Sequence, residues 1–474
     1  MKPYRLWGLI LLFMTASWLT AAGFSLSGVG TKGLSMGGAY RSVVSDWSSI
    51  FWNPAGLAAV EMNEISLTGT FISPLSSYVP HTQIPGYDGG YPMRYRVNAK
   101  SRLFVLPQIA YVMNADFLSS TKFGVALFTP FGLGASWDLY DPPIGFYERG
   151  YTPPKAFPEH DWESDISITC AYAGFARKFG PLSIGLSGGP LFGSISLRKV
   201  RLYDPVTVDT SLYSLPVQFR YFPIDTRFDG SGVSFGLNFG IKLEPLKNLT
   251  LGLSGRYYSP VKLTGDVNSA IYFPKNSVLE SLADPEGKIF FQGGVLEADG
   301  DVSTELKLPM SLGGGISYAF GDLTLAFDAE LTTWSVLDQI ALDITGISFF
   351  GDSLPDDTLV MNWRNTWKYS FGIEYRGGER TVIRLGAYYD EGAVTDSTLT
   401  PLIPDINSKV SVNVGLSYLL TDRLTFDFNY EFVRASRKSV SNFVDVDSDG
   451  EPDNMPGEYS LSVDAAGIGL SFRF

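Results

Sequence analysis

The chain has 474 residues, a formal net charge of −13, 18% charged residues and 14% aromatic residues. The acidic balance argues against nucleic acid as a partner, and a single cysteine, Cys170, excludes an intramolecular disulfide framework. The length would suit two or three soluble domains, but no linker separates two cores.

The first 21 residues have the features of a secretory signal peptide. Basic residues precede an apolar run from Leu6 to about Leu19, and small residues follow, which predicts cleavage after Ala21 or Ala22. No run of about 18 apolar residues follows, so the sequence predicts no helical anchor. A signal peptide followed by the strands described below predicts a protein of the outer membrane of a Gram-negative-type cell.

Residues 22–61 are rich in Gly, Ser and Ala and contain the sequence WNPAGL at residues 52–57. About forty residues are too few for a domain with its own core, but a wide barrel leaves a channel that such a segment would fill. We therefore predict an N-terminal plug inside a barrel; the alternative is a flexible tail, which would leave Trp47 and Phe51 in water. The plug motif consists of Trp52, Asn53, Pro54, Ala55 and Gly56.

Residues 62–474 are predicted to form an all-β, transmembrane antiparallel β-barrel. In residues 424–432 (LTFDFNYEF) one strand face is wholly apolar and the other wholly polar. This alternation recurs without intervening helices, which favours a membrane barrel over a soluble sandwich, with the polar face toward the lumen. We predict about fourteen strands, near residues 62–78, 101–114, 121–134, 165–179, 181–202, 231–245, 248–265, 302–320, 322–337, 364–377, 380–391, 408–421, 423–437 and 458–474.

The joints between these strands alternate between tight turns and long loops. The tight turns contain Gly, Pro, Asn or Asp and lie at residues 178–181, 244–248, 320–322, 376–379 and 420–423. The long connections are residues 135–164, 203–230, 266–301 and 338–363. Bacterial barrels place short turns in the periplasm and long loops outside, so we predict an even strand number with both termini periplasmic.

Several short stretches of the chain resemble the FadL, OmpP1 and TodX family of outer-membrane transporters of long-chain fatty acids and other hydrophobic compounds. The similar stretches are residues 22–24, 33–40 (GLSMGGAY), 52–57, 123–125, 129–134, 308–309, 323–326, 333–335 and 403–405. The resemblance implies a plugged fourteen-stranded barrel that captures an apolar ligand on extracellular loops, passes it to a lumenal pocket and releases it sideways through the wall. Phe474 is similar to the C-terminal aromatic residue that the barrel-assembly machinery reads.

Pro130 lies within a strand-like run and is our candidate for the lateral opening. Proline lacks the N–H that a ladder bond needs, so it bends the strand, and Gly132 and Gly134 leave little side chain to fill the space. The alternative is that Pro130 only ends the strand at the outer rim.

The connection that follows this strand is dense in aromatic rings. An exposed loop keeps such rings only if they pack together or bind something, so we predict a hydrophobic capture surface, with self-packing as the alternative. The rings are Trp137, Tyr140, Phe146, Tyr147, Tyr151, Phe157 and Trp162.

The carboxylate of a fatty acid would need a cationic partner in a partly dry lumen. The family that the chain resembles usually has basic residues near its pocket, and the candidates here are Arg364, Lys368, Arg384 and Lys409. Alternatively these cations pair with wall carboxylates. A pocket with no cation would favour a neutral hydrocarbon.

Asp445, Asp447 and Asp449 precede Gly450 as in a calcium loop, but Pro456 stands where an EF-hand has its bidentate Glu. We therefore predict at most a weak external calcium site; a solvated acidic tip is the alternative. No other cofactor is expected.

The chain holds only two histidines, His81 and His160, so we predict no enzyme, with an outer-membrane lipase as the rival. We predict a monomer whose partners are a hydrophobic small molecule, outer-membrane lipid and, during biogenesis, the assembly machinery. The alternative function is that of a secretion or assembly partner.

Overall fold

The structure is a computed structural model that describes residues 23–81, 96–115, 121–142, 144–203, 222–283, 285, 287–349, 352–353, 356–403 and 405–474. The proposed signal peptide, residues 1–21, lies outside the described residues. None of the helices in the described ranges is long and apolar enough to cross a membrane.

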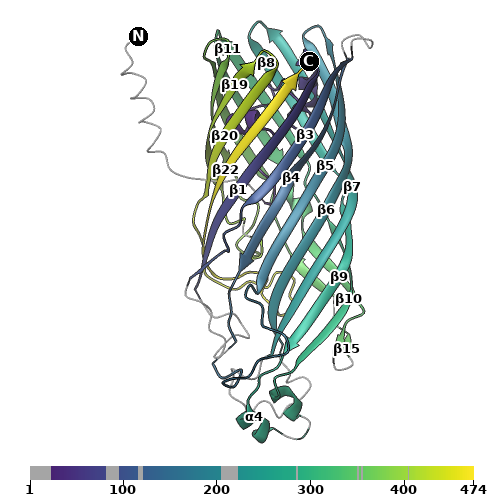
Figure 1. Ribbon diagram of the computed structural model, residues 1–474, viewed down its shortest axis with the longest axis vertical. Coiled ribbons are helices and arrows are strands. Elements are labelled where there is room, and N and C mark those ends of the chain that lie inside the picture. The colour runs from purple at the N-terminus through teal and green to yellow at the C-terminus, as the bar shows by residue number, and fades with distance from the viewer. Residues whose placement is uncertain are drawn as a thin grey trace, which may run out of the picture.

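Fourteen strands of the described residues form a closed antiparallel barrel (Figure 1). Each pairs with the next along the chain, and β22 closes the ring by pairing with β1, from Glu64 opposite Arg473 to Pro80 opposite Gly457. In ring order the strands are β1 (Glu64–Pro80), β3 (Phe104–Ala115), β4 (Thr121–Trp137), β5 (Trp162–Phe179), β6 (Leu182–Tyr203), β7 (Phe222–Leu246), β8 (Leu249–Tyr258), β11 (Ser311–Phe320), β12 (Leu323–Thr332), β17 (Thr366–Arg376), β18 (Thr381–Asp390), β19 (Lys409–Thr421), β20 (Leu424–Ala435) and β22 (Gly457–Arg473).

Tight turns and the C-terminus share one end of the barrel, and the longer connections lie at the other end (Figure 1). The predicted turns join β5 to β6, β7 to β8, β11 to β12, β17 to β18 and β19 to β20. The long-loop end carries β2 (Val97–Asn98), β9 (Val261–Tyr272), β10 (Val295–Leu306), α4 (Ser277–Leu282), η6 (Gly287–Phe291), η7 (Trp334–Val336), β13 (Gln339–Thr345), β14 (Ser348–Phe349), β15 (Asp352–Ser353), β16 (Asp357–Val360) and β21 (Lys438–Val440). Since bacterial barrels keep short turns in the periplasm, the long-loop end is the extracellular end.

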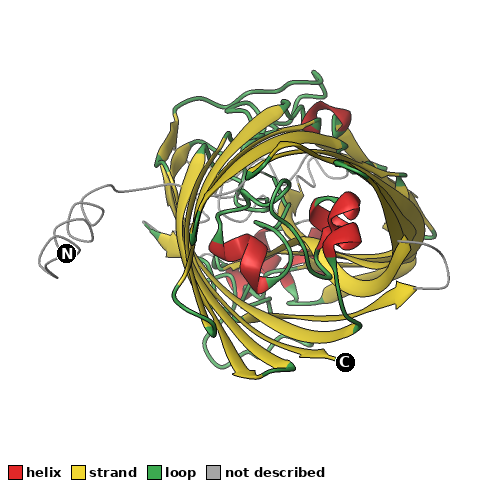
Figure 2. Ribbon diagram, turned by 90° about the horizontal axis from the view of Figure 1, so that it is seen from above, coloured by secondary structure: helices red, strands yellow, loops and turns green. Residues whose placement is uncertain are grey.

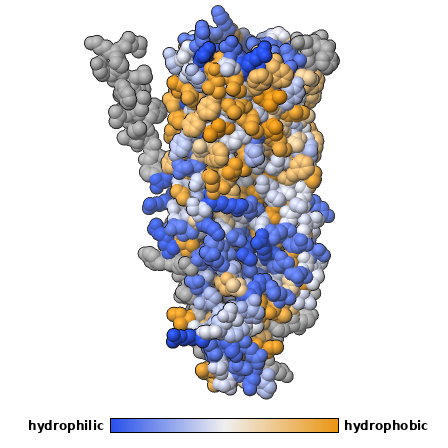
Figure 3. Space-filling model, in the orientation of Figure 1, coloured by the Kyte–Doolittle hydropathy of each residue, from blue (hydrophilic) through white to orange (hydrophobic). Residues whose placement is uncertain are grey.

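The strand alternation sorts side chains between lipid and lumen as predicted. On β20, Tyr430 and Phe432 are exposed on the outer face, whereas Asn429 and Glu431 are buried inside the barrel. Figure 3 shows the resulting hydrophobic belt near the short-turn end, with a hydrophilic wall beyond it. Pairing of β22 with β1 closes the ring, which is the condition for spanning a bilayer with strands.

Beyond the belt, the polarity of the two faces is reversed. On β5 the inward side chains of Ile166 and Ile168 are buried, while Asp165 and Ser167 face outward. Buried Leu263 of β9 belongs to the same apolar inner wall. The extracellular part of the barrel is therefore polar outside and apolar inside, which suits a path for an apolar ligand.

Prolines divide two of the predicted long strands. The predicted strand 248–265 is interrupted at Pro260 between β8 and β9, and the predicted strand 302–320 is interrupted at Pro309 between β10 and β11. Because proline cannot donate a ladder bond, each strand is interrupted there, but the neighbours are kept: β9 pairs with β7 and β10, as β8 pairs with β7 and β11. The predicted loop 203–230 was too long, since β7 already begins at Phe222.

The N-terminal segment lies inside the ring, where Figure 2 shows its short helices surrounded by strands. These helices are α2 (Thr31–Ser35), α3 (Ser49–Trp52) and η1 (Pro54–Ala59). The predicted plug therefore occupies the lumen, and its rings Trp47 and Phe51 are buried instead of facing water.

Candidate functional site

The plug motif lies against the inner wall at β6 and β7, and all five of its residues are buried. The Asn53 side chain donates hydrogen bonds to the carbonyls of Arg41 (2.9 Å) and Ile241 (3.1 Å), which ties the plug to β7. A Cβ at Gly240 would overlap Asn53 Oδ1, and a Cβ at Gly185 would overlap the backbone of Pro54. The motif thus needs both its own amide and two wall glycines.

A kink in β4 is centred on Pro130. The ladder with β5 shifts between Phe128 and Phe131, so that Thr129 and Pro130 together oppose a single residue, Thr169. Such a bulge bends the strand. Because β4 continues to Trp137, Pro130 does not end the strand at the rim.

The wall has a gap beside this kink. Pairing of β3 with β4 stops at Ile109 opposite Leu127, although β3 extends to Phe104 along β1. The next backbone hydrogen bond across the gap, from Lys100 N to Ser136 O, is 2.8 Å long. Within the described residues 96–115 and 121–142, the wall therefore lacks β3–β4 ladder bonds between these two points.

The two candidate glycines border this gap. A Cβ at Gly134 would overlap the Phe104 ring, and a Cβ at Gly132 would lie in ordinary contact, 3.7 Å, from the Leu26 side chain of the plug. Side chains of β3 and of the plug therefore partly fill the gap. The predicted set Pro130, Gly132 and Gly134 is brought together at one place in the wall, and its role as an exit stays a prediction.

The start of the plug is hydrogen-bonded to the kinked strand. Leu26 N donates to Pro130 O, and Gly132 N donates to Phe24 O, each at 2.9 Å. The Phe24 ring packs edge-on against Phe131 and Trp334, with centroids 5.8 and 5.0 Å apart. Because β3 does not pair with this part of β4, the plug supplies hydrogen-bond partners for the β4 backbone.

The same N-terminal segment is held by an ion pair at the start of β19. Gly23 N donates to Asp405 Oδ2 at 2.7 Å, and Asp405 pairs with Lys409. Lys409, predicted as a ligand-binding cation, thus neutralises the carboxylate that holds the start of the plug.

A lumenal cavity of about 50 Å³ lies between the plug and the kink. Its apolar side is formed by Phe51, Trp52, Phe131, Tyr258 and Trp334, and its polar side by Arg41, Arg256, Glu330, Lys368 and Asp390. Since this volume is far below that of typical ligand pockets, roughly 300 to 1,000 Å³, a ligand must displace side chains or the plug.

Only one of the four predicted cations lines this cavity. Lys368 Nζ donates to Ser27 O of the plug at 3.1 Å and lies 4.0 Å from the centroid of the Tyr388 ring. Arg384 instead binds Glu374 on the neighbouring strand, with a separation of 2.8 Å. Arg364 donates to the Gly392 carbonyl at 2.9 Å, outside the cavity lining.

Two further cations, Arg41 and Arg256, line the cavity and were missed from the sequence. Arg41 pairs with Asp328 at 3.2 Å and with Glu330, and Arg256 also pairs with Glu330. Arg256 additionally lies 4.3 Å from the centroid of the Phe51 ring. The only sequence signals were the position of Arg41 directly after the GGAY stretch and that of Arg256 on a polar strand face.

The predicted capture loop, Ala135–Trp162, is shorter in the structure: β4 ends at Trp137 and β5 begins at Trp162, so the connection is 138–161. Its rings are mostly packed. Trp137, Tyr140 and Phe146 are almost fully buried. The loop is joined to residues 273–294 by hydrogen bonds, among them Lys275 N to Phe146 O at 2.8 Å. A second such bond runs from Tyr151 Oη to Gly293 O at 2.6 Å.

The remaining predicted rings lie in the same layer. Phe157 packs edge-on against Tyr272 at 5.4 Å, Tyr147 lies between Phe146 and Tyr151, and Trp162 is buried at the start of β5. Self-packing, the alternative weighed above, therefore accounts for much of the ring density. Capture stays a prediction for the partly buried rings.

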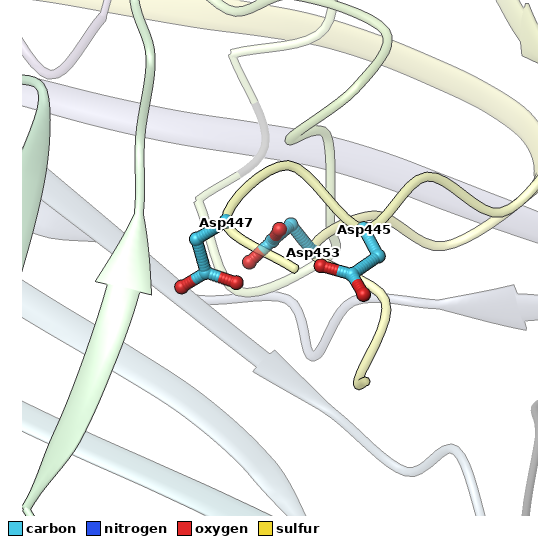
Figure 4. A group of neighbouring side chains, drawn as sticks. All are labelled: Asp445, Asp447 and Asp453. Atoms are coloured by element: carbon cyan, nitrogen blue, oxygen red, sulfur yellow. The ribbon is translucent and has the colours of Figure 1, made fainter. Parts of the chain in front are cut away.

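The acidic loop between β21 and β22 gathers a slightly different set of carboxylates from that predicted. Oxygens of Asp445, Asp447 and Asp453 lie within 4.8 Å of one another (Figure 4). The carboxylate of Asp449 instead accepts a hydrogen bond from Glu451 N at 2.7 Å. Asp453, four residues further along, takes the predicted place of Asp449 because the turn at Gly450 brings it back toward Asp445.

Comparisons with known proteins agree with this geometry. Residues 223–474 match the family described as outer membrane protein transport protein (OMPP1/FadL/TodX). The chain belongs to this family. It is therefore an outer-membrane β-barrel protein, and the belt in Figure 3 is the part that faces the bilayer.

The relatives cover almost the whole chain. A long-chain fatty acid transport protein of Escherichia coli O6:H1 (strain CFT073) is 21% identical over 448 residues, 90% of each chain. Among solved structures, a Pseudomonas aeruginosa FadL homologue has a TM-score of 0.71 at 18% identity, covering 96% of this chain and 100% of that one. The P. putida toluene transporter TodX has a TM-score of 0.70 at 18% identity, with 95% and 99% covered. These structural matches establish the shared fold.

Proposed function

We propose that this protein carries hydrophobic small molecules into the outer membrane, long-chain fatty acids and hydrocarbons being the two cargo classes. The ligand is captured between the extracellular loops 138–161 and 273–294, moves along the apolar inner wall and enters the cavity beside the plug. It leaves sideways at Pro130. The relatives named for long-chain fatty acids and toluene support both cargo classes.

The observation that carries this proposal is the gap between β3 and β4. It adjoins an aromatic-lined cavity, and it lies next to plug residues Phe24–Leu26, where Ser25 forms a β-bridge with Phe131. An apolar molecule can pass there from the cavity to the outside of the wall, beside the exposed side chains of Val105 and Ile109.

The test replaces Pro130 with Val, which restores a ladder donor and lets β4 straighten. Uptake of labelled oleate by a transporter-deficient strain is expected to fall several-fold for Pro130→Val. Pro74→Val is the matched control, because Pro74 lies in the unbroken β1–β22 ladder. Equal uptake by both variants would contradict a lateral exit at Pro130.

Lys368 distinguishes the two cargo classes. If the cavity holds a carboxylate, Lys368→Met lowers oleate uptake and leaves toluene uptake unchanged, since only the former needs a cation. Equal effects on both ligands would assign Lys368 to holding Ser27 of the plug instead.

The proposal includes no catalytic step and no cofactor, and the protein acts as a monomer after assembly through Phe474. The alternative is a secretion or assembly partner. Wild-type oleate uptake no higher than that of the empty strain, with protein partners co-purifying, would support that alternative.

A further inference from the structure

A second break in the ladder of the wall lies between β8 and β11, separated from the kinked strand β4 by β5, β6 and β7. Pairing of β8 with β11 ends at Arg256 opposite Ser311. Toward the extracellular end, β9 and β10 resume the pairing at Val261 opposite Leu306. The segments between these two pairs, which we call the distal break, are residues 257–260 and 307–310.

Proline stands on both strands of the distal break and explains it. The ladder keeps one register across the break, which places Pro309 opposite Tyr258 and Pro260 opposite Lys307. Each of these two pairs therefore lacks one of its N–H donors. Within the described residues 222–283 and 287–349, no backbone hydrogen bond joins the two segments of the break.

The chain also turns over at the distal break. On the side of the short turns, Arg256 and Tyr258 are buried and line the cavity, whereas beyond the break Val261 and Leu263 are buried. An uninterrupted strand buries every second residue, so the inward face has shifted by one residue within the break. The backbone is therefore rotated there, as in a bulge, and the break is more than a missing hydrogen bond.

The inner side of the distal break is the cavity beside the plug. Tyr258 and Pro309, which oppose each other across the break, both line that cavity, and so does Pro130. The Tyr258 ring packs edge-on against Phe131 of the kinked strand, with centroids 5.1 Å apart. One cavity therefore reaches both interruptions of the wall.

The outer side of the distal break is apolar. Tyr257 and Met310, opposite each other in the register, are 47% and 48% exposed. Leu253 and Leu312 continue this exposed surface toward the short turns, whereas exposed Lys262 begins the polar wall on the other side. The break therefore lies at the extracellular edge of the hydrophobic belt, where the wall meets lipid.

We propose that the distal break is a second lateral opening, through which hydrophobic molecules dissolved in the surrounding membrane exchange with the cavity. Side chains close it in place of ladder bonds, since Leu308 and Pro309 are buried there. Moving them breaks no backbone hydrogen bond between the two segments. This inference rests on the proposed function, because it gives the transported class of molecule a second route to the same cavity, independent of Pro130.

The test uses the full chain in proteoliposomes whose lipid contains a diazirine-labelled hexadecane, with adducts mapped by mass spectrometry after illumination. Pro130→Val is the starting variant, because it closes the exit of the proposed function. We expect the cavity residues Tyr258 and Trp334 to be labelled in this variant. Adding P260V/P309V, which restores both ladder donors, should reduce this labelling at least about fivefold.

P74V/P223V in the same Pro130→Val background is the matched control and should leave the labelling unchanged. Both of its prolines lie in continuous ladders, Pro74 between β1 and β22 and Pro223 between β6 and β7.

A reversible cross-link closes the distal break by a second means. Y257C/M310C, joined by a reducible bis-methanethiosulfonate in the Pro130→Val background, should lose the labelling and regain it on reduction. The native Cys170 is buried and does not compete. L251C/I316C is the control, because these exposed residues oppose each other in the intact ladder of the same two strands.

Labelling that persists in both closed variants overturns the inference. Loss of labelling in Pro130→Val alone also overturns it, and supports Pro130 as the route between cavity and membrane. Wild type without labelled cavity residues overturns it as well. Whole-cell uptake decides the proposed function separately, since wild-type oleate uptake no higher than that of the empty strain overturns that function whatever the labelling.

Discussion

Gly240 allows the plug to approach the wall closely, because any β-carbon there would overlap Asn53 Oδ1 and crowd Pro54. Overpacking such a contact costs about 1–3 kcal/mol. We expect Gly240→Val to displace the plug motif from β7 and to raise the conductance of the protein in planar bilayers.

Gly314→Val is the control for this substitution. Gly314 also lies in a wall strand, but the nearest atom to its added Cβ is Gly252 O at 3.9 Å. Conductance equal to wild type in both variants would show that the motif does not need the glycine.

The cations show what residue-level pattern could predict. Lys368 and Arg384 both stand on inward strand faces of β17 and β18, where strand alternation directs a side chain to the lumen. Only the neighbouring strands decided their contacts, since Glu374 neutralises Arg384 whereas Lys368 reaches the plug. Such contacts depend on register, which single-strand patterns do not contain.

Asp161 lies directly before β5 and holds the beginning of the capture loop. Its titration makes the stability of this loop depend on pH. The buried Asp161 carboxyl accepts hydrogen bonds from the N–H groups of Leu139 (3.0 Å) and Tyr140 (2.7 Å). Burial, the largest effect, outweighs these bonds and raises the pKa of Asp161 to about 7.

The sign follows from comparing the folded and open loop. A free Asp ionises near pH 4, so between about pH 4 and pH 7 the folded loop keeps a proton that the open loop has lost. The free energy that holds the loop therefore decreases as pH rises through this window. Hydrogen exchange of residues 138–161, corrected for intrinsic rates, should be faster at pH 7.5 than at pH 5.

Asp161→Asn should flatten this pH dependence, because an amide does not titrate. Asp165→Asn is the control, since Asp165 lies on the outer face in an exposed pair with Arg102. A profile unchanged by Asp161→Asn would assign the pH dependence to another group.

The acidic loop makes a separate prediction at the level of one element. Calorimetry with CaCl₂ should show binding on the order of 10⁻⁴ to 10⁻³ M, the range of extracellular calcium modules. Asp453→Asn should abolish the signal and Asp449→Asn should retain it, because only Asp453 joins Asp445 and Asp447. Absence of binding in the millimolar range would leave the loop as a solvated acidic tip.

At the scale of the whole molecule, the ring of wall strands is closed by strand pairing, and among the described residues the plug contributes backbone-to-backbone hydrogen bonds only at the gap beside Pro130. Every wall strand has neighbours on both sides in the described ranges, and β22 pairs with β1 along the full length of β1. Deleting residues 24–60 should therefore leave a folded, heat-modifiable barrel with large steady conductance in planar bilayers. A deletion variant that folds but stays closed would show that the extracellular loops, and not the plug, seal the lumen.

The sequence by itself determined the strand number, the inward and outward faces within the hydrophobic belt and the side on which the loops lie. Those features follow from the two-residue period of a strand and from turn chemistry, both of which are local. Likewise, Pro130 was identifiable because proline alone lacks the ladder donor.

Only the tertiary structure decided what these elements meet. The gap beside Pro130 exists because β3 stops pairing with β4, and plug residues Phe24 and Leu26 bond to the β4 backbone there. Arg41 from the plug and Arg256 from β8 converge on Glu330. Each of these contacts joins residues far apart in the chain, and their meeting is fixed by ring closure and register, which no local pattern encodes.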